Sequence, residues 1–296
     1  MHHWEASKRL FSKWQARAKS VLEMVHSDLY GPINPVSNGN KKYFISFIDD
    51  FSRKTWVYFL QEKSEAFEAF KSFKALVENE SDKKIKILRT DRGGEYCSKE
   101  FDAFCNEKGI KRQLTTAYTP QQNGVSERKN QTILNMVRSL LVKGSIPKKF
   151  WPEVVLWSVH ILNRSPTFSV KNMTPQEAWS GQKPLVDHFK VFGCIAYAHI
   201  PDEKRKKLDD KSEKCIFLGV SEVSKAYKLY NPVTKKIVVS RDVIFDEDTI
   251  WNWFENILVQ LQIPVDDSDK EDIAALETQS QQPPQPEVQS SQQFEK

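Results

Sequence analysis

Three short segments, each dense in β-branched and aromatic residues, constrain the fold of this chain most. They cover residues 23–30, 43–48 and 55–60. Asn38 with Gly39, and the polar stretch 50–53, supply turn signals between them. Runs of this length and chemistry predict strands, and their close spacing predicts an antiparallel meander.

Beyond the third segment, helical and strand patterns alternate. Apolar residues between 66 and 77 recur with the helical period, and Ser64 is the expected N-cap. The further expected helices cover residues 98–108, 124–142, 147–163 and 175–181, and the further expected strands cover 84–88 and 110–114. Strands followed by alternating helices and strands are typical of an α/β fold with a mixed sheet.

The pattern becomes β again after residue 190. Short apolar runs separated by polar turns cover residues 191–200, 215–220, 226–230 and 236–245. Several short strands in about sixty residues suit a small barrel or sheet. The predicted organisation is a basic N-terminal arm (1–20), an α/β domain (21–183), a small β domain (184–253) and a disordered linker (254–296), the last rich in acids, glutamine and proline.

The formal charge of +5 conceals a division along the chain. Residues 262–296 carry a net charge of −6, so residues 1–261 carry +11. A basic body favours a polyanion such as nucleic acid as partner, and the alternative is a merely solvated basic surface. The longest near-continuous apolar run, 191–200, is half the length that crosses a bilayer, so no membrane partner is expected.

The cysteines favour a reducing intracellular compartment. None of the four forms a C-x-x-C pair, and no apolar leader follows Met1. This pattern excludes a disulfide scaffold and a zinc ribbon. All four are expected to be buried thiols.

Three carboxylates fall where a predicted strand ends or a predicted helix begins: Asp28, Asp91 and Glu127. Carboxylate oxygens are the hard ligands that Mg²⁺ prefers, and a small set leaves coordination positions for water and phosphate oxygens. Two such ions about 3.5–4 Å apart stabilise the attacking and leaving oxygens of an in-line displacement at phosphorus. Without a cation the carboxylates would repel one another. The site therefore predicts Mg²⁺ as cofactor, with Mn²⁺ as a substitute.

Four ordered blocks carry a family resemblance. They read HSDLYGP (26–32), FIDDFSR (47–53), RTDRGGEY (89–96) and YTPQQNGVSER (118–128). Together they resemble the integrase core of copia-type LTR retrotransposon polyproteins. Thirty-five residues separate Asp91 from Glu127, as in the D,D-35-E pattern of retroviral-type integrases. The similarity covers about residues 20–250.

The resemblance implies an RNase H-like fold with five mixed strands, followed from about residue 184 by a small SH3-like barrel. It implies that Asp28, Asp91 and Glu127 form the metal-binding triad of a nucleotidyltransferase and endonuclease. The implied reactions are 3′-end processing of element DNA and its strand transfer into target DNA. The implied partners are the ends of the element DNA, the target duplex and further copies of the chain. The implied location is the nucleus, after a cytoplasmic stage.

Polar and basic residues near the triad are candidate DNA contacts. Gln121 and Asn123 precede the helix of Glu127, while Arg128 and Lys129 follow Glu127 and are expected to point away from its face. The alternative for the first two is simple solvation. The fifth candidate is the basic cluster Lys204, Arg205, Lys206 and Lys207, for which a nuclear localisation signal or a solvated loop are the alternatives.

Other conspicuous residues have structural interpretations. Gly93 and Gly94 are expected to relieve backbone strain beside Asp91. The remaining expectations are a turn shaped by Asp49 and Asp50, core positions for Trp151 and Trp157, and hydrogen-bonded core or rim positions for His26 and His160.

One departure from the family pattern concerns the N-terminal region. A His-His-Cys-Cys zinc module normally precedes such a core, but only His2 and His3 precede His26, and no cysteine precedes Cys97. Adjacent histidines do not supply four tetrahedral ligands. A fragment of a longer polyprotein or a degenerate copy is therefore expected. The alternative functions are a non-catalytic nucleic-acid-binding relic and a ribonuclease H acting on RNA–DNA hybrids.

Overall fold

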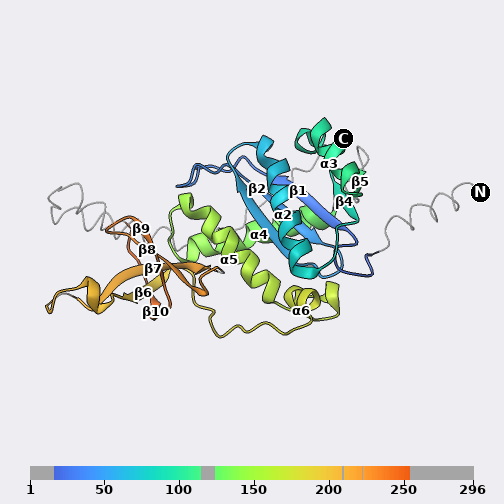
Figure 1. The fold of residues 1–296 in the computed structure, drawn as a ribbon. Coiled ribbons are helices and arrows are strands. Elements are labelled where there is room, and N and C mark those ends of the chain that lie inside the picture. Colours follow the sequence, from blue (N-terminus) through green and yellow to red (C-terminus); the bar gives the residue numbers. More distant parts are fainter. Residues whose placement is uncertain (1–16, 115–123, 209, 222, 254–296) are drawn as a thin grey trace, which may run out of the picture. The chain divides into compact units, whose positions relative to one another are not determined.

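The computed structural model describes residues 17–114, 124–208, 210–221 and 223–253, which form two separate five-stranded sheets (Figure 1). The predictions for residues 1–16, for Gln121 and Asn123, and for 254–296 lie outside these residues. None of the helices in the described ranges has the length and apolar character needed to cross a membrane.

The first sheet is mixed, as the sequence predicts. Its strands are β1 (Val25–Tyr30), β2 (Tyr43–Asp49), β3 (Thr55–Leu60), β4 (Ile87–Thr90) and β5 (Lys111–Leu114). Their spatial order is β3-β2-β1-β4-β5. The first three form the antiparallel meander, and β4 and β5 run parallel to β1. The carboxyl ends of β1 and β4 therefore meet at one end of the sheet.

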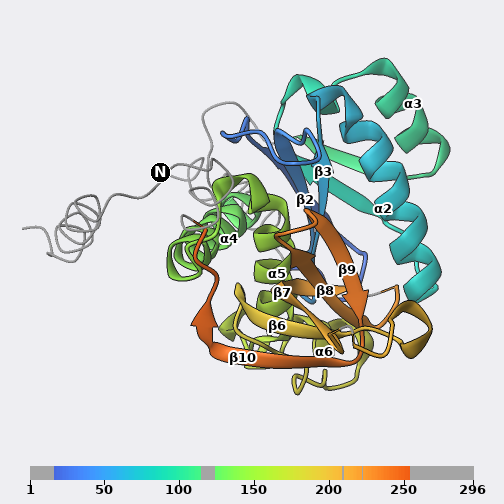
Figure 2. The ribbon, with the colours of Figure 1, turned by 90° about the vertical axis from the view of Figure 1, so that its left-hand side faces the viewer.

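Helices cover both faces of this sheet (Figure 2). The helices are α2 (Ala66–Ser81), α3 (Lys99–Glu107), α4 (Gly124–Lys143), α5 (Trp151–Arg164) and α6 (Pro175–Ser180). Buried side chains of α2 and α3 share one core with strand residues such as Val25 and Phe47. On the opposite face α4 contacts β1 and β2, and α5 contacts β3.

Aromatic rings dominate the core beneath α2. Phe47 stacks on Phe73 with ring centroids 4.4 Å apart, and Phe70 stacks on Phe101 at 5.2 Å. All four side chains are fully buried. Burial of each contributes roughly 1.5–3 kcal/mol, and such ring pairs contribute about 0.5–1.5 kcal/mol more. This packing holds β1 and β2 in register on the face opposite α4.

Two helix starts differ from the sequence prediction. Ser64 is not an N-cap, because residues 63–65 form a 3₁₀ turn that precedes α2. The Glu65 carboxylate accepts the backbone N–H groups of Gln61 and Glu62, both at 2.9 Å, and so stabilises the start of this 3₁₀ turn. Similarly, a 3₁₀ turn at Lys148–Phe150 precedes α5, which begins at Trp151.

The second sheet is entirely antiparallel. Its strands are β6 (Cys194–His199), β7 (Ser212–Ser221), β8 (Ala226–Asn231), β9 (Lys236–Ser240) and β10 (Val243–Ile250), in the order β10-β6-β7-β8-β9. The prediction of one continuous strand over 236–245 is wrong. The chain turns at Arg241 and Asp242, so that β9 pairs with β8 while β10 pairs with β6 at the other edge.

Several predicted core positions are confirmed. Trp151 and Trp157 are buried, and the Trp157 ring lies edge-on to Phe217 of β7, with centroids 5.1 Å apart. Cys105, Cys194 and Cys215 are also buried. Cys97 is exposed, contrary to the prediction, because it follows a short 3₁₀ turn at the surface rather than lying on the inner face of α3.

Candidate active site

Asp28 lies on β1 on the sheet face that α4 covers. The side-chain amide of Asn130, a buried residue of α4, donates a 2.8 Å hydrogen bond to Asp28 Oδ2. Burial raises the pKa of Asp28 to about 6 despite this hydrogen bond, and the carboxylates of Asp91, Glu127 and Glu95 act in the same direction. Asp28 is therefore a carboxyl group surrounded by like charge.

Asp91 follows β4 directly, at the end of the sheet where β1 also ends. Its Oδ1 accepts the backbone N–H of Gly93 at 3.0 Å, which closes the turn after the strand. The parallel pairing of β1 with β4 thus places two of the three predicted carboxylates on neighbouring strands. This proximity explains why Asp91 contributes to the raised pKa of Asp28.

The glycine pair beside Asp91 has a different role from the predicted one. Gly93 has φ −56°, and neither Gly93 nor Gly94 has positive φ, so no backbone strain is relieved there. A Cβ atom at Gly93 would instead lie 2.6 Å from Glu95 Oε1. Gly93 therefore leaves room for a fourth carboxylate beside the candidate triad.

Glu127 lies in the first turn of α4, where its charge is favourable to the helix dipole, and its side chain is exposed. It lies within electrostatic reach of Asp28. Within the described ranges, however, no group of three His, Cys, Asp or Glu side chains is close enough to hold a metal ion. The three predicted carboxylates converge on one end of the sheet without closing into a ligand cluster.

Three functional neighbours were missed by the sequence analysis: Glu95, Tyr96 and Asn130. Tyr96 is fully buried, and its hydroxyl lies 2.7 Å from Ser27 Oγ. Burial raises the pKa of Tyr96 well above its usual value, and the nearby carboxylates add to this effect. Asn130 could have been found, because it follows Glu127 by three residues and so shares its helix face.

A second acidic pair, Asp49 and Asp50, holds the adjacent turn as predicted. Asp49 Oδ2 accepts both the N–H and the hydroxyl of Ser52 at 2.7 Å. Asp50 Oδ1 lies 2.9 Å from His26 Nε2 and 3.1 Å from Arg53 Nη1. Burial opposes ionisation of Asp50, but the hydrogen bonds from His26 and the N–H of Ala18, together with Arg53, lower its pKa to about 2.

The two histidines have partners, as predicted. His26 is buried and bonded through Nε2, while its Nδ1 has no hydrogen-bond partner among the described residues. His160 Nε2 lies 2.9 Å from His188 Nε2, and Arg164 donates to His160 Nδ1 at 2.9 Å. Because Nδ1 accepts, His160 carries its proton on Nε2.

The candidate DNA contacts differ in exposure. Arg128 is exposed, whereas Lys129 is half-buried, and burial together with Arg53 lowers the pKa of Lys129. In the basic cluster, Lys206 and Lys207 are exposed, and Arg205 is half-buried and ion-paired with Asp202. The side chain of Lys204 lies outside the described atoms.

Sequence comparisons identify two domain families. Residues 18–120 match the integrase core domain, and residues 194–259 match the retroviral polymerase SH3-like domain. The chain is 46% identical over 240 residues to a retrovirus-related Pol polyprotein from transposon TNT 1-94 of Nicotiana tabacum. It is 35% identical over 268 residues to that from transposon RE1 of Arabidopsis thaliana. These matches cover 81% and 90% of this chain but only 18% of each polyprotein.

Two of the solved structures that match the chain are viral integrase structures, both with TM-scores below 0.5. A simian T-cell lymphotropic virus intasome in complex with a PP2A regulatory subunit matches with TM-score 0.47 at 15% identity, covering 77% of this chain and 81% of that one. The HTLV-2 integrase catalytic core domain in complex with magnesium matches with TM-score 0.42 at 19% identity, covering 55% of this chain and 99% of that one.

Proposed function

Because residues 18–120 belong to the integrase core family and residues 194–259 to the retroviral polymerase SH3-like family, we propose that this chain is a retrotransposon integrase core. Its reactions are processing of the 3′ ends of element DNA and their strand transfer into target DNA. One observation supports this proposal. Asp28 and Asp91 lie on or directly after neighbouring strands, and burial raises the pKa of Asp28 to about 6, with smaller contributions in the same direction from Asp91 and Glu127.

The donor set fits a divalent cation of the Mg²⁺ type. Asp28, Asp91 and Glu127, with Glu95 beside them, offer only carboxylate oxygens, and their mutual repulsion is relieved by a bound cation. Mg²⁺, or Mn²⁺ in its place, would be held by the first three. When bound, such ions stabilise charge on the attacking and leaving oxygens at phosphorus.

The surrounding residues have positioning roles in this proposal. Asn130 fixes one oxygen of Asp28 through its 2.8 Å hydrogen bond. Tyr96 anchors Ser27, the residue before Asp28, from the opposite face of β1 through its 2.7 Å contact. Since the two contacts act on successive residues from opposite faces, they limit rotation of the strand at the point where the carboxylate must be aimed.

DNA is the proposed partner in both reactions. The charge of +11 on residues 1–261 supports attraction of phosphates, and contacts from Arg128, Lys129 and the basic cluster 204–207 would position the duplex without reading its sequence. Gln121 and Asn123 are proposed as further contacts. Several copies of the chain are proposed to assemble with one another. They are proposed to act in the nucleus after a cytoplasmic stage.

The test is strand transfer on a branched oligonucleotide that mimics the joined product, with Mg²⁺ or Mn²⁺. We expect activity in the unmodified chain, and its loss by at least a factor of about 10³ in Asp91→Asn and in Glu127→Gln, because each removes a carboxylate charge needed in the transition state. Glu100→Gln, at an exposed position in the first turn of α3, is the matched control. Unchanged activity in Asp91→Asn would refute the proposed site.

A second candidate function is a nucleic-acid-binding relic without catalysis. The observation that favours it is the absence of a closed three-ligand cluster among the described side chains. A folded chain that binds DNA with steep salt dependence, but never cuts or joins it with either metal, would support this candidate.

A further inference from the structure

The outer edge of the first sheet presents free backbone groups in β3. Lys54 directs its carbonyl toward β2, where it accepts the N–H of Asp49 at 3.0 Å. Backbone direction alternates along a strand, so Thr55, Val57 and Phe59 direct their N–H and C=O groups outward. The ladder with β2 therefore leaves these groups unused.

Asn163 of α5 shows what the edge can bind. Its side-chain amide accepts the N–H of Thr55 at 2.9 Å and donates to the C=O of Thr55 at 2.8 Å. The amide thus replaces one residue of a neighbouring strand. Among the described residues, none forms a hydrogen bond with the outward backbone groups of Val57, the next outward residue of β3. The edge is closed at Thr55 and open at Val57.

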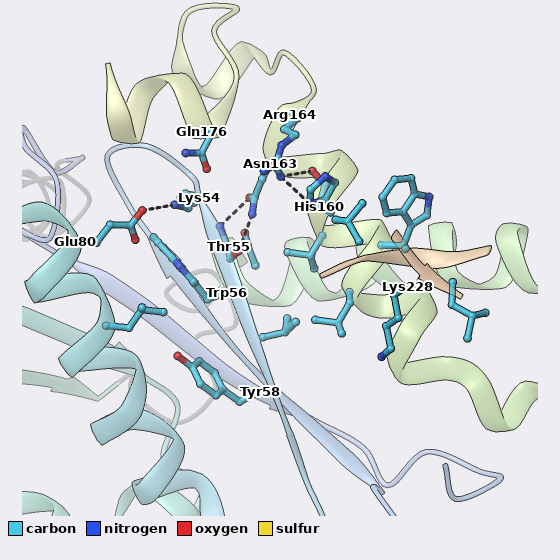
Figure 3. A pocket seen from close by; sticks show the side chains of 18 residues that line it. Lys54, Thr55, Trp56, Tyr58, Glu80, His160, Asn163, Arg164, Gln176 and Lys228 are labelled. Carbon is cyan, nitrogen blue, oxygen red and sulfur yellow. Dashed lines mark hydrogen bonds and ion pairs between the residues drawn. The ribbon is translucent and has the colours of Figure 1, made fainter. Parts of the chain in front are cut away.

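A cavity of about 560 Å³ lies beside this open edge (Figure 3). β3, the C-terminal part of α2, α5 and β7 line it. Its apolar lining includes Leu76 and Leu156, which are 51% and 44% exposed. A second cavity of about 590 Å³ shares six of its lining residues and extends to β8 and Arg241. We call the two together the β3 groove.

The β3 groove is basic. One acidic residue, Glu80, lines it, against five basic ones: Lys54, Arg164, Lys225, Lys228 and Arg241. Lys54 is ion-paired with Glu80 at 3.2 Å, and Lys228 lies 3.5 Å from Glu153. Within the described part of the chain, Lys225 and Arg241 have no carboxylate partner. The groove therefore combines an open strand edge with excess positive charge.

We propose that the β3 groove binds an extended acidic segment of a partner protein, which pairs with β3 as an added strand. An open edge requires alternating donors and acceptors, and a peptide backbone supplies both. Nucleic-acid phosphates only accept hydrogen bonds, so they leave the outward carbonyl of Val57 unpaired. A second copy of this chain would bring the same basic groove and be repelled. The proposal is independent of the reaction proposed above.

The test is binding of a fluorescein-labelled acidic peptide of sequence DVEVDVEV to the full chain, followed by fluorescence anisotropy. Amide hydrogen exchange with and without peptide locates the contact. We expect saturable binding and slower exchange at the Val57 amide. The control peptide DPEPDPEP, in which proline replaces every valine, is expected to bind at least tenfold more weakly, because proline has no N–H group for pairing.

Two sets of variants distinguish the contribution of backbone pairing at β3 to peptide binding from the contribution of positive charge. Val57→Pro removes the outward N–H and leaves the β2 ladder intact, and it is expected to weaken binding at least tenfold. Lys225→Glu with Arg241→Glu is expected to do the same. The control is Lys235→Glu with Lys236→Glu, at exposed positions outside the groove lining.

The proposal is overturned if the peptide does not bind, if binding is equally strong in Val57→Pro with native-like circular dichroism, or if the exchange protection lies elsewhere. It is also overturned if a single-stranded oligonucleotide of equal charge displaces the peptide and protects the Val57 amide itself. A tenfold loss in both groove variants, with none in the control pair, supports it.

Discussion

Asp28 and Asp50 lie on or directly after adjacent strands of one sheet, yet their surroundings shift the two pKa values in opposite directions. The pKa of Asp28 rises to about 6, whereas that of Asp50 falls to about 2. Asp50 accepts hydrogen bonds from His26 and Ala18 and is ion-paired with Arg53, whereas Asp28 accepts a hydrogen bond from the Asn130 amide and lies near the carboxylates of Asp91, Glu127 and Glu95. The difference distinguishes a carboxylate whose ionised form stabilises the fold from one whose ionised form is unfavourable in the folded chain, as the proposed cation site requires.

Removal of the Asp50 charge should have the largest effect on stability. Asp50→Asn removes the negative charge that pairs with Arg53 in a buried position and replaces one acceptor oxygen by an NH₂ donor, so we expect a loss of about 3 kcal/mol in the free energy of unfolding. Urea denaturation followed by circular dichroism measures it. The exposed Asp82→Asn is the control and should change stability by less than about 0.5 kcal/mol. If Asp50→Asn and Asp82→Asn change the free energy of unfolding equally, the proposed stabilising role of the Asp50 charge is wrong.

The same change at Asp28 should act with the opposite sign. Asp28→Asn removes a charge that is unfavourable in the folded state, so without divalent metal at pH 7 we expect an increase of about 2 kcal/mol in the free energy of unfolding. Strand transfer should be lost in the same variant. A destabilised Asp28→Asn would show that the carboxylate contributes to folding as Asp50 does.

The raised pKa of Asp28 also predicts how the difference in unfolding free energy between Asp28→Asn and the unmodified chain depends on pH. Asp28 binds its proton below about pH 6 when folded and below its ordinary value when unfolded, so its charge disfavours the folded state increasingly as pH rises between these values. The stability gap between Asp28→Asn and the unmodified chain should therefore shrink by about 1.5 kcal/mol from pH 7 to pH 4. Denaturation curves at both pH values measure the gap, and a constant gap would exclude a raised pKa.

The smallest effect concerns Asn130. Asn130→Ala removes a hydrogen bond that lowers the pKa of Asp28, so we expect the midpoint of the Asp28 titration to rise by less than about one pH unit. Carbon-detected NMR of the side-chain carboxyl measures this midpoint. Thr132→Ala, an exposed position of α4, should leave it unchanged. A lower midpoint in Asn130→Ala would show that the amide does not stabilise the ionised form.

Local patterns in the sequence predicted most of the first sheet and where its carboxylates lie. The density of β-branched and aromatic residues in β1 and β2 and the helical period of α2 involve only residues close together in the sequence, so they predict these elements without knowledge of the fold. The exact helix starts are not predicted in this way, because a 3₁₀ turn at residues 63–65 precedes α2 and removes Ser64 from the N-cap position. The split between β9 and β10 was also missed, since each strand is defined by a different partner.

The rest of the site depends on contacts between distant segments. Glu95 is significant because Gly93 makes room for it beside Asp91, and only the folded turn reveals this. The β3 groove is likewise absent from any local pattern, because Asn163 and Thr55 are 108 residues apart. Lys129 was predicted to point away from the face of Glu127 and to contact DNA, and the structure shows it half-buried, with Arg53 near enough to lower its pKa.

The hydrogen bond between Asp28 and Asn130 joins residues 102 positions apart along the chain. Contacts of such long separation form late, because the entropy of closing the intervening loop must be overcome before they contribute. During synthesis, β1 leaves the ribosome about a hundred residues before the helix that completes its surroundings. A growing chain therefore has no assembled carboxylate site until α4 has been translated and has docked, so the proposed site is complete only once the whole domain has folded.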